Sequence, residues 1–264
     1  MRVPFDANSA NENRFTDTSL GSGFLAYREC PFESMCFQNH TAEILEWDSE
    51  HFPQLFALFL ENNGFKQGDL LSVRLPAHDI AAIKQAETAG FYFIESTIIP
   101  FIHLRNWNRA RFERFIKPME KVTEVTISIV EEIARSSFRD GRFNLDPNIG
   151  NNRSDYRYKM WLRNAYDAGE DIQIIKYRDQ IAGFSLLRFE DDKASYRMAC
   201  IHSELKNSGL GMLLFASTMV YCMELGIKYI SGGINMANLP VLNTMSNLGF
   251  SFREPSIVLH RYID

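Results

Sequence analysis

Apolar and polar residues follow two different periods along the chain. Consecutive or alternating Ile, Leu, Val and Phe residues are typical of strands, whereas apolar residues three or four positions apart indicate helices. Between residues 42 and 104 this pattern predicts strands at 42–47, 69–76 and 91–104, and helices at 48–64 and 77–90. Strands that alternate with helices favour a layered sheet, so we expect an α/β fold with a mixed sheet.

The second half of the chain has strand and helix signals in another order. Three strand-like runs joined by short turns, as in a meander, lead into a glycine-led helix that starts at residue 209. The runs are residues 171–177, 181–189 and 195–202. The other predicted elements are a strand and helix at 123–138, a polar loop at 139–155, a helix at 156–169, a strand at 229–235, a helix at 239–249 and one or two strands at 250–263.

The two patterns meet near Pro118, in a charged and aromatic stretch. We therefore expect an N-terminal domain at residues 1–117, irregular over its first forty residues, and a C-terminal domain at 118–264. A chain of 264 residues is long enough for two modest domains. No internal repeat is obvious, although each half contains a helix that ends in a Gly-Phe pair, at Gly90-Phe91 and Gly249-Phe250.

Composition and charge exclude several classes of function. Apolar residues make up 45% of the chain and charged residues 23%, as in ordinary globular proteins. A net charge of -5 provides no general attraction to nucleic acid or to anionic lipid, so we expect neither partner. The first residues lack the apolar core of a signal peptide, and the cysteines and histidines match no metal motif. We expect a cytoplasmic protein without a metal, for which a homodimer is compatible with the sequence.

The stretch "IHSELKNSGLGMLLFASTMVYCMELG", residues 201–226, has two glycines just before a long apolar run. The run is interrupted by Ser217, Thr218, Tyr221 and Glu224 and lacks positively charged flanks, so a membrane span is disfavoured. A helix buried in a globular core is the better interpretation.

A glycine-rich turn before a helix can bind phosphate. The main-chain N–H groups at a helix N-terminus point outward, and the helix dipole favours an anion there. Gly209 and Gly211 would allow close approach of a pyrophosphate, while Lys206 and Ser208 could add a cation and a hydroxyl. A dinucleotide-binding fingerprint needs a third glycine where Leu214 stands, and a P-loop motif is absent. The alternative is a helix that merely begins with a flexible turn.

The same turn resembles the acyl-CoA pyrophosphate loop of the GNAT superfamily of N-acyltransferases. In that loop Gln or Arg is followed by two residues, Gly, one residue, and Gly or Ala, and here Lys206 takes the first position. The order of elements from about residue 120 is also similar to the core of that superfamily. The resemblance implies acyl-CoA as co-substrate, either acetyl-CoA or 3-hydroxybutyryl-CoA. It assigns cofactor binding to Ile201, Lys206, Asn207, Ser208, Gly209, Leu210, Gly211, Met212 and Asn238.

One position departs from the resemblance. Many GNAT enzymes have a Tyr four residues before the Gly-Phe pair, where it is proposed to protonate the leaving thiolate, and here that residue is Met245. A thioether has no proton to donate. Water or Ser246 would then supply the proton, or the chain does not catalyse the usual transfer. Loss of a bulky Tyr is also compatible with room for a longer acyl group.

A closer resemblance covers most of residues 42–264. The segments "LEWDSEHF", "AAIKQAETAGFYFIESTI", "SSFRDGRFNLDPNI" and "YKMWLRNA" are similar to GNAT acyltransferases that act on dTDP-linked amino-deoxyhexoses, the group including the dTDP-fucosamine acetyltransferase. This resemblance implies a truncated GNAT-like N-terminal half packed against a complete C-terminal one. It also implies that a nucleotide sugar binds in the cleft between the halves, and that the product serves O-antigen or other surface polysaccharide synthesis.

A dTDP-sugar would need cations, an apolar or aromatic wall and polar side chains in its site. The polar loop supplies such residues where no core role requires them. The alternative is that this loop is only a solvated surface segment. Our candidate substrate-binding residues are Arg139, Arg142, Phe143, Asn144, Asp146 and Arg153. Trp47 and Trp161 fit a core role better than stacking on thymine.

The expected mechanism is direct attack of a sugar amine on the thioester. Main-chain N–H groups near Cys200 and Ile201 would stabilise the oxyanion, and the amine needs a base. Cys200 is better interpreted as a buried, inert thiol than as a nucleophile, because no histidine-carboxylate relay is evident. The candidates for the base are His202, Glu204, Asp146 and Glu190.

Two other functions stay open at the level of sequence. The acceptor amine could belong to an amino acid or a peptide N-terminus, which would not need the arginines of the polar loop. Alternatively, the chain could be a non-catalytic module that binds acyl-CoA and has lost turnover together with the Tyr.

Overall fold

The computed structural model describes residues 12–16, 23–48, 51–206 and 208–263, and its main feature is one mixed sheet that runs through the molecule. The 12 strands are β1 (Asn13–Thr16), β2 (Phe24–Glu29), β3 (Thr41–Trp47), β4 (Leu70–Pro76), β5 (Tyr92–His103), β6 (Glu120–Lys121), β7 (Asp171–Tyr177), β8 (Gln180–Glu190), β9 (Lys193–Ile201), β10 (Tyr229–Gly232), β11 (Ile234–Asn235) and β12 (Ser251–Tyr262). Their order across the sheet is β1-β2-β3-β4-β12-β5-β10-β9-β8-β7-β6, with β11 on β5.

Helices cover both faces of this sheet. The α-helices are α1 (Pro31–Phe37), α2 (Phe52–Asn62), α3 (Ile80–Thr88), α4 (Ile127–Ser137), α5 (Arg142–Leu145), α6 (Asn151–Asp167), α7 (Leu210–Glu224) and α8 (Leu239–Leu248). Short 3-10 helices are η2 (Leu104–Asn106), η3 (Arg109–Phe115) and η4 (Ser203–Leu205). None of the helices in the described segments combines the length and apolar character that a bilayer crossing requires.

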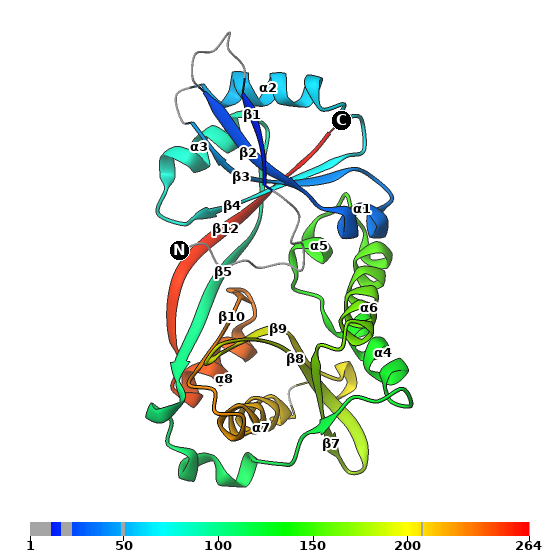
Figure 1. Ribbon diagram of the computed structural model, residues 1–264, viewed down its shortest axis with the longest axis vertical. Helices are drawn as coiled ribbons and strands as arrows, with labels where there is room; N and C mark the ends of the chain where they lie inside the picture. Colours follow the sequence, from blue (N-terminus) through cyan, green and yellow to red (C-terminus); the bar gives the residue numbers. More distant parts are fainter. Residues whose placement is uncertain (1–11, 17–22, 49–50, 207, 264) are drawn as a thin grey trace.

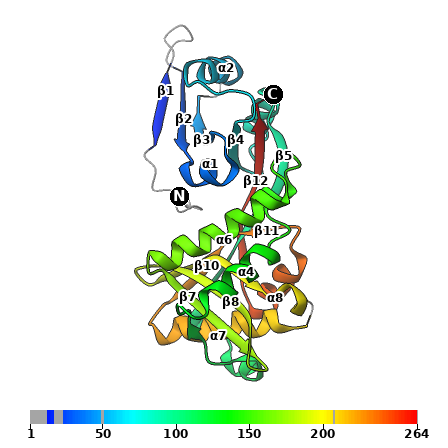
Figure 2. The ribbon, with the colours of Figure 1, turned by 90° about the vertical axis from the view of Figure 1, so that its right-hand side faces the viewer.

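The molecule has two lobes that share two long strands. The upper lobe in Figure 1 holds β1 to β4 with α2 and α3, and the lower lobe holds β7 to β10 with α7 and α8. Strands β5 and β12 run from one lobe into the other. Figure 1 shows α5 beside the junction of the lobes, and Figure 2 shows α6 next to the same junction.

The last strand of each half pairs with strands of the other half. β12 pairs with β4, and β5 pairs with β10, while β5 and β12 pair with each other, all antiparallel. The boundary predicted between residues 117 and 118 therefore divides the chain but not the sheet, because β12 comes from the second segment and lies between two strands of the first.

The structure also contains an internal repeat that the sequence did not make obvious. The order strand, helix, strand, helix, strand occurs twice, as β3-α2-β4-α3-β5 and as β9-α7-β10-α8-β12. The same sequence separation relates Gly90 to Gly249 and Thr97 to Ser256, and these last two face each other across β5 and β12 with their hydroxyls 2.9 Å apart. Asp79 and Asn238 cap the N-termini of the matching helices α3 and α8. The Gly-Phe pairs at Gly90-Phe91 and Gly249-Phe250 occupy equivalent positions in this repeat.

Three apolar clusters hold the layers together. In the upper lobe, α2 and α3 pack on the sheet through residues such as Phe52, Phe59 and Leu259. In the lower lobe, α4 and α6 cover one face of the sheet and α7 and α8 cover the other. Helix α7 is buried along most of its length, which explains why its sequence is apolar on all sides.

Residues 1–40 were expected to be irregular with short elements, and the described part of them contains β1, β2 and α1, which are such elements. Two local predictions were wrong, both in segments whose structure depends on tertiary contacts. No strand forms at 123–126, which is a turn that leads into α4. The polar loop at 139–155 contains α5 and the first residues of α6. The remaining strands and helices lie close to their predicted positions.

Candidate functional site

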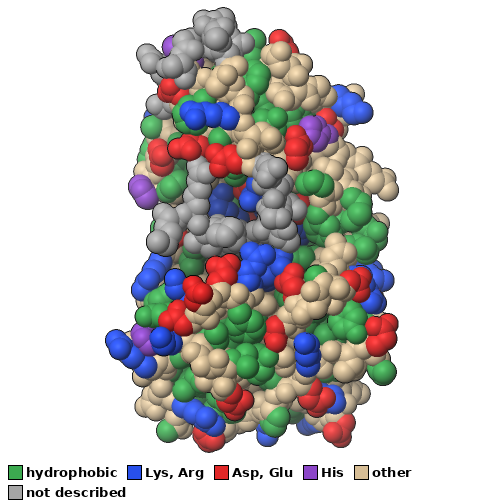
Figure 3. All heavy atoms as spheres, in the orientation of Figure 1, with side chains coloured by type: hydrophobic (Ala, Val, Ile, Leu, Met, Phe, Trp, Pro, Cys, Tyr) green, Lys and Arg blue, Asp and Glu red, His purple; other side chains and the backbone are tan. Residues whose placement is uncertain are grey.

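A cavity of about 580 Å³ lies at the junction of the lobes. Its walls come from β4, β5, β9, the segment from α4 to α6, and the N-terminal ends of α7 and α8. Figure 3 shows basic and acidic side chains gathered across the middle of the face seen in Figure 1. The cavity joins two chemically different regions, one formed by β9, α7 and α8 and one formed by β5, α5 and α6.

Strands β9 and β10 separate inside this cavity. Their parallel pairing ends at Tyr196 and Gly232, and the next short strand, β11, pairs with β5 instead. The far part of β9 keeps its antiparallel pairing with β8, with Ile201 opposite Gly183. One edge of β9 is consequently open to the cavity.

Main-chain groups on that open edge can be assigned. The His202 N–H donates to the Ala182 carbonyl at 2.8 Å, so that pair is hydrogen-bonded across the two strands. Because bonded and non-bonded pairs alternate along an antiparallel ladder, the main-chain N–H and C=O of Ile201 point away from β8, whereas those of Cys200 point toward it. Ile201 and Ala199 can therefore pair with an extended ligand along the open edge.

Helix α7 begins at the end of this edge. Gly209 is left-handed, with φ at 80°, and precedes the first helical residue, Leu210. The first N–H groups of a helix have no partner within the helix and carry the positive end of its dipole. Gly209, Leu210, Gly211 and Met212 all line the cavity, so this helix end presents an anion-binding surface there.

The other residues assigned to the cofactor have mixed positions. Ile201, Lys206 and Asn238 line the cavity. The Lys206 ammonium donates to the Ser137 carbonyl at 2.9 Å and so links the loop to the end of α4. Asn238 caps α8 by accepting from the Val241 N–H. Ser208 is not among the lining residues, and Asn207 lies outside the described residues.

The candidate catalytic residues do not all meet at the cavity. Cys200 lines it, and burial raises the pKa of its thiol far above the ordinary value, which agrees with an inert thiol. The side chain of His202 does not line the cavity, because its Nδ1 accepts from the Glu204 N–H and caps η4. Ser246 is exposed and also lies away from the cavity, about 100° around the helix from Met245. Neither side chain is placed to exchange protons with the reacting atoms.

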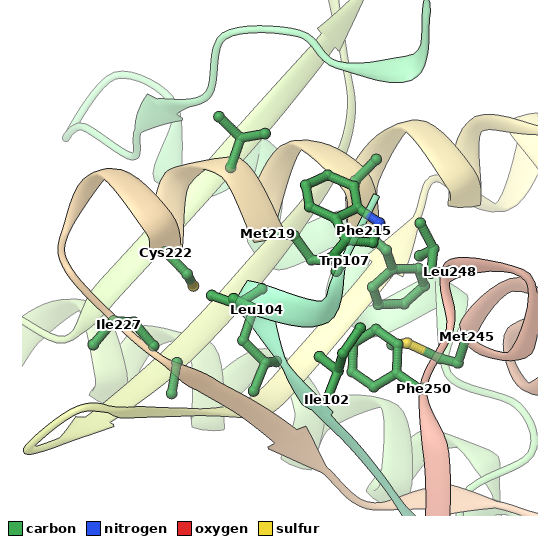
Figure 4. Close-up of a cluster of buried hydrophobic side chains, with 14 of the residues drawn as sticks. Ile102, Leu104, Trp107, Phe215, Met219, Cys222, Ile227, Met245, Leu248 and Phe250 are labelled. Carbon is green, nitrogen blue, oxygen red and sulfur yellow. The ribbon is translucent and has the colours of Figure 1, made fainter. Parts of the chain in front are cut away.

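Met245 has a structural role. Its side chain is 2% exposed and belongs to the apolar cluster of α7 and α8. Figure 4 shows it beside the ring of Phe250 in the cluster. It also contributes to the cavity wall, where it offers an apolar surface and no proton.

Three of the six residues expected to bind the acceptor line the cavity, namely Arg139, Arg142 and Phe143. The other three do not line it. Asn144 bonds to Asp155 and Ser154 within the α5 to α6 segment, and Arg153 is exposed on the first turn of α6. Asp146 is 1% exposed and is used in a buried network.

That network fixes the segment after α5 to the sheet. Asp146 lies 2.6 Å from Nδ1 of His260 on β12 and accepts from the Tyr92 hydroxyl on β5 and from the Asn148 N–H. Burial opposes ionisation of Asp146, but the bonds from His260 and Asn148 outweigh it and lower the pKa of this carboxyl. Asp146 is therefore a structural anion rather than the base, and the exposed Glu204 and Glu190 do not line the cavity either.

Glu95, which was not among the predicted site residues, is the buried carboxylate of the cavity. It is 7% exposed, and burial raises its pKa although the charges of Arg142 and Arg74 act in the opposite direction. Its carboxylate accepts from the Asn235 amide at 2.9 Å. A glutamate within the apolar run "FYFIESTIIP" was a signal that could have identified it, because a buried charge in a strand is rare without a partner or a role.

Arginines and aromatic rings form the wall contributed by α5 and α6. Arg157 on α6 forms a buried ion pair with Glu33 on α1, and its guanidinium lies 4.5 Å from the centroid of Phe143 and 4.9 Å from that of Trp161. Trp161 therefore belongs to the cavity wall as well as to the core. In contrast, Trp47 lies in the upper lobe, where it stacks on Phe52 and donates to Gln85.

Within the described ranges, no three His, Cys, Asp or Glu side chains form a group that could hold a metal ion.

Comparisons with known proteins support the fold. No family model matches the chain. A curated relative, the spore coat polysaccharide biosynthesis protein SpsD of Bacillus subtilis, is 21% identical over 252 residues, which cover 92% of this chain and 85% of the relative. A conserved protein of unknown function from Staphylococcus epidermidis superposes with a TM-score of 0.64 over 100% of this chain and 99% of its own, at 11% identity. A GCN5-related N-acetyltransferase from Sphaerobacter thermophilus has a TM-score of 0.62 over 90% and 80% of the two chains, at 8% identity.

The chain therefore has the GNAT fold, as the order of its elements predicted. The lower lobe, from β7 to α8, contains the separated strands, the open edge of β9 and the helix N-terminus that line the cavity.

Proposed function

We propose that this protein is an acyl-CoA-dependent N-acyltransferase that acylates the amine of a dTDP-linked amino-dideoxyhexose. The observation that carries the proposal is a single cavity that joins the open edge of β9 and the N-terminus of α7 to a buried carboxylate, Glu95. The first two features suit pantetheine and a pyrophosphate, and the third suits proton removal from an amine.

The reaction follows from these parts. The acceptor amine attacks the thioester carbonyl carbon, and the developing oxyanion is stabilised by main-chain N–H groups on the open edge of β9. The carbon–sulfur bond then breaks, CoA leaves as its thiolate, and the proton lost by the nitrogen passes to Glu95. Since Met245 has no proton to donate, the thiolate leaves without one from that position.

Three features support a nucleotide sugar as the acceptor. The wall formed by the segment from α4 to α6 contains Arg142 and Arg139, which suit phosphate oxygens. Arg139 also pairs with Asp155 at 2.6 Å, but its side chain is 44% exposed, so a second anion near it keeps contact with water. The cavity lies between the lobes, where the resemblance to sugar acyltransferases places the acceptor. The relative from Bacillus subtilis is named for polysaccharide biosynthesis, so we assign the product to the synthesis of a surface polysaccharide such as O-antigen. The acyl group is acetyl or 3-hydroxybutyryl.

The proposal is tested by release of free thiol. Acetyl-CoA and 3-hydroxybutyryl-CoA are each incubated with the protein and with dTDP-3-amino and dTDP-4-amino dideoxyhexoses. We expect thiol release with one sugar and one thioester, and its rate should fall at least tenfold when Arg139 and Arg142 are both replaced by Gln. Thiol release only with amino acids or peptides would refute the sugar acceptor. Binding of acetyl-CoA with no thiol release from any amine would refute the enzyme.

A further inference from the structure

Two buried N–H donors in the cavity wall have no acceptor among the described residues, and the buried hydroxyls of Ser137 and Tyr196, which also line the cavity, have no partner there either. Nη2 of Arg197 and Nε1 of Trp161 are both unpaired, and both residues line the cavity. The Arg197 side chain and Trp161 are each 8% exposed. An unsatisfied buried donor destabilises the fold, so unpaired donors on a cavity wall indicate that a ligand supplies the acceptor.

The two donors belong to neighbouring side chains. The guanidinium carbon of Arg197 lies 5.4 Å from the centroid of the Trp161 ring. The Arg157 guanidinium contacts the same ring and is itself held by Glu33. The indole is thus fixed by cationic neighbours, and the polar group it can offer to a ligand is its N–H.

The charge of Arg197 is already neutralised. Its Nη1 donates to both carboxylate oxygens of Glu170 at 2.6 Å. An anionic ligand group would be a second negative charge on one guanidinium, and its desolvation would be poorly offset. Nη2 instead suits an uncharged oxygen, such as a hydroxyl or a carbonyl.

The position of Arg197 selects the acceptor rather than acyl-CoA. Its guanidinium lies over Trp161 of α6 and bonds to Glu170, just after the end of that helix. The acyl-CoA features, by contrast, are the main-chain edge of β9 and the N-terminus of α7, a helix that packs on the other face of the sheet. Arg197 also lies at the register shift of β9 against β8, close to the point where β9 leaves β10.

We propose that Arg197 and Trp161 form a subsite that binds an uncharged hydroxyl or carbonyl oxygen on the sugar ring of the acceptor. This inference rests on the proposed function, since it takes the acceptor to be an amino sugar. Two groups of residues would then bind the acceptor. Other arginines of the cavity bind its phosphates. The indole N–H of Trp161 and Nη2 of Arg197, whose charge is neutralised by Glu170, orient its sugar ring.

The test begins with binding, which needs no turnover. The chain has three tryptophans, so its ¹⁵N spectrum should contain three indole N–H signals, which Trp→Phe variants assign. Titration with a dTDP-4-amino-4,6-dideoxyhexose should move the Trp161 signal downfield. Acetyl-CoA alone should leave that signal in place, and the Trp47 signal should not respond, because its N–H already donates to Gln85.

Kinetics provide the second measurement. Trp161→Phe and Arg197→Lys each remove the unpaired donor, while the lysine keeps a cation for Glu170. Each should raise the KM for the acceptor about tenfold and leave the Kd for acetyl-CoA unchanged. Trp107→Phe is the matched control, because the N–H of Trp107 is also buried and unpaired but does not line the cavity.

The outcomes separate the two proposals. If a nucleotide sugar is acylated while the Trp161 signal stays fixed and both variants keep the wild-type KM, the subsite is refuted and the function stands. If no sugar is acylated yet the Trp161 signal moves with a sugar probe, the function is refuted and the subsite stands. If no probe is acylated and none moves the signal, both are refuted.

Discussion

At the scale of single residues, hydrogen-bond partners separate the carboxylates that can take part in chemistry from those that hold the fold. Glu95 and Asp146 are both buried, but their partners differ. Asp146 bonds to a histidine, a tyrosine and a main-chain N–H, whereas Glu95 faces the cavity with an amide and two arginines near it. The pKa of the first is lowered and that of the second is raised, so only Glu95 suits a base.

Replacement of Glu95 by Gln should lower kcat/KM for the acceptor by about 10²- to 10⁴-fold. Activity of the wild type should fall as the pH drops through the raised pKa of Glu95, above the usual value near 4.5, because protonation removes the base. The variant should lack this acidic limb. Rates measured from pH 5 to pH 9 test the expectation, with Glu190→Gln as a control outside the cavity. Full activity of the Glu95 variant would exclude it as the base.

His260 provides a prediction about stability. Burial lowers the pKa of this histidine, against the opposing effect of Asp146, so the folded protein keeps it neutral. Below its unfolded pKa of about 6.5 the unfolded chain binds a proton that the folded protein does not. The stability supplied by neutral His260 is therefore fully present above that pH and is lost as the pH falls. For one proton, the free energy of unfolding falls by up to about 1.4 kcal/mol for each pH unit.

Urea unfolding between pH 5 and pH 7.5 measures this slope. In His260→Gln the free energy of unfolding should change less steeply with pH, because the variant lacks the one proton that His260 binds on unfolding. The variant should also be less stable at every pH. The exposed His78 offers a control, since His78→Gln should leave the slope as it is. An unchanged slope in the His260 variant would contradict the assignment.

At the scale of elements, the site depends on how closely β9 lies on β8. A Cβ at Gly183 would lie 2.5 Å from the Cys200 carbonyl oxygen and 2.8 Å from Cδ1 of Ile201. Both distances are shorter than the contacts that a Cβ atom makes in proteins. Glycine at this position therefore allows β9 to keep its register and to present the main chain of Ile201 to the cavity.

Gly183→Ala should displace the end of β9. We expect a loss of about 1–3 kcal/mol in the free energy of unfolding, together with a weaker Kd for acetyl-CoA, since the open strand edge moves. Thermal unfolding and calorimetric titration measure the two effects. If the variant binds acetyl-CoA as the wild type does, the open edge of β9 does not contribute to acyl-CoA binding.

At the scale of the whole molecule, the exchange of β5 and β12 makes the two halves interdependent. β12 has β4 and β5 as its neighbours, and both belong to residues 1–117. β10 likewise depends on β5 for one of its two partners. The cavity is formed by both halves, since Glu95 and Arg74 come from the first and Gly209 from the second.

Residues 118–264 produced alone should consequently fail to fold. β12 would have no strand beside it, and its unpaired main-chain groups and apolar side chains would promote aggregation. Production of residues 1–117 and 118–264 together should restore a soluble complex. Circular dichroism and gel filtration of the separate and combined fragments test this. A stable, monomeric fragment 118–264 would show that the exchanged strands are dispensable.

The sequence determined the local elements and much of the region proposed to bind acyl-CoA. Period, capping residues and glycines are local features, so the strands near 171–202 and the helix after Gly209 were predictable. The GNAT fold was expected from the resemblance of the glycine turn and of the order of elements to that superfamily. Only the tertiary structure decided which side chains share the cavity. It brought Glu95, Arg197 and Trp161 together from β5, β9 and α6, and it placed His202, Asp146 and Ser246 elsewhere. The physical reason is that burial and hydrogen-bond partners across exchanged strands are set by contacts between residues far apart in sequence, and no local pattern records them.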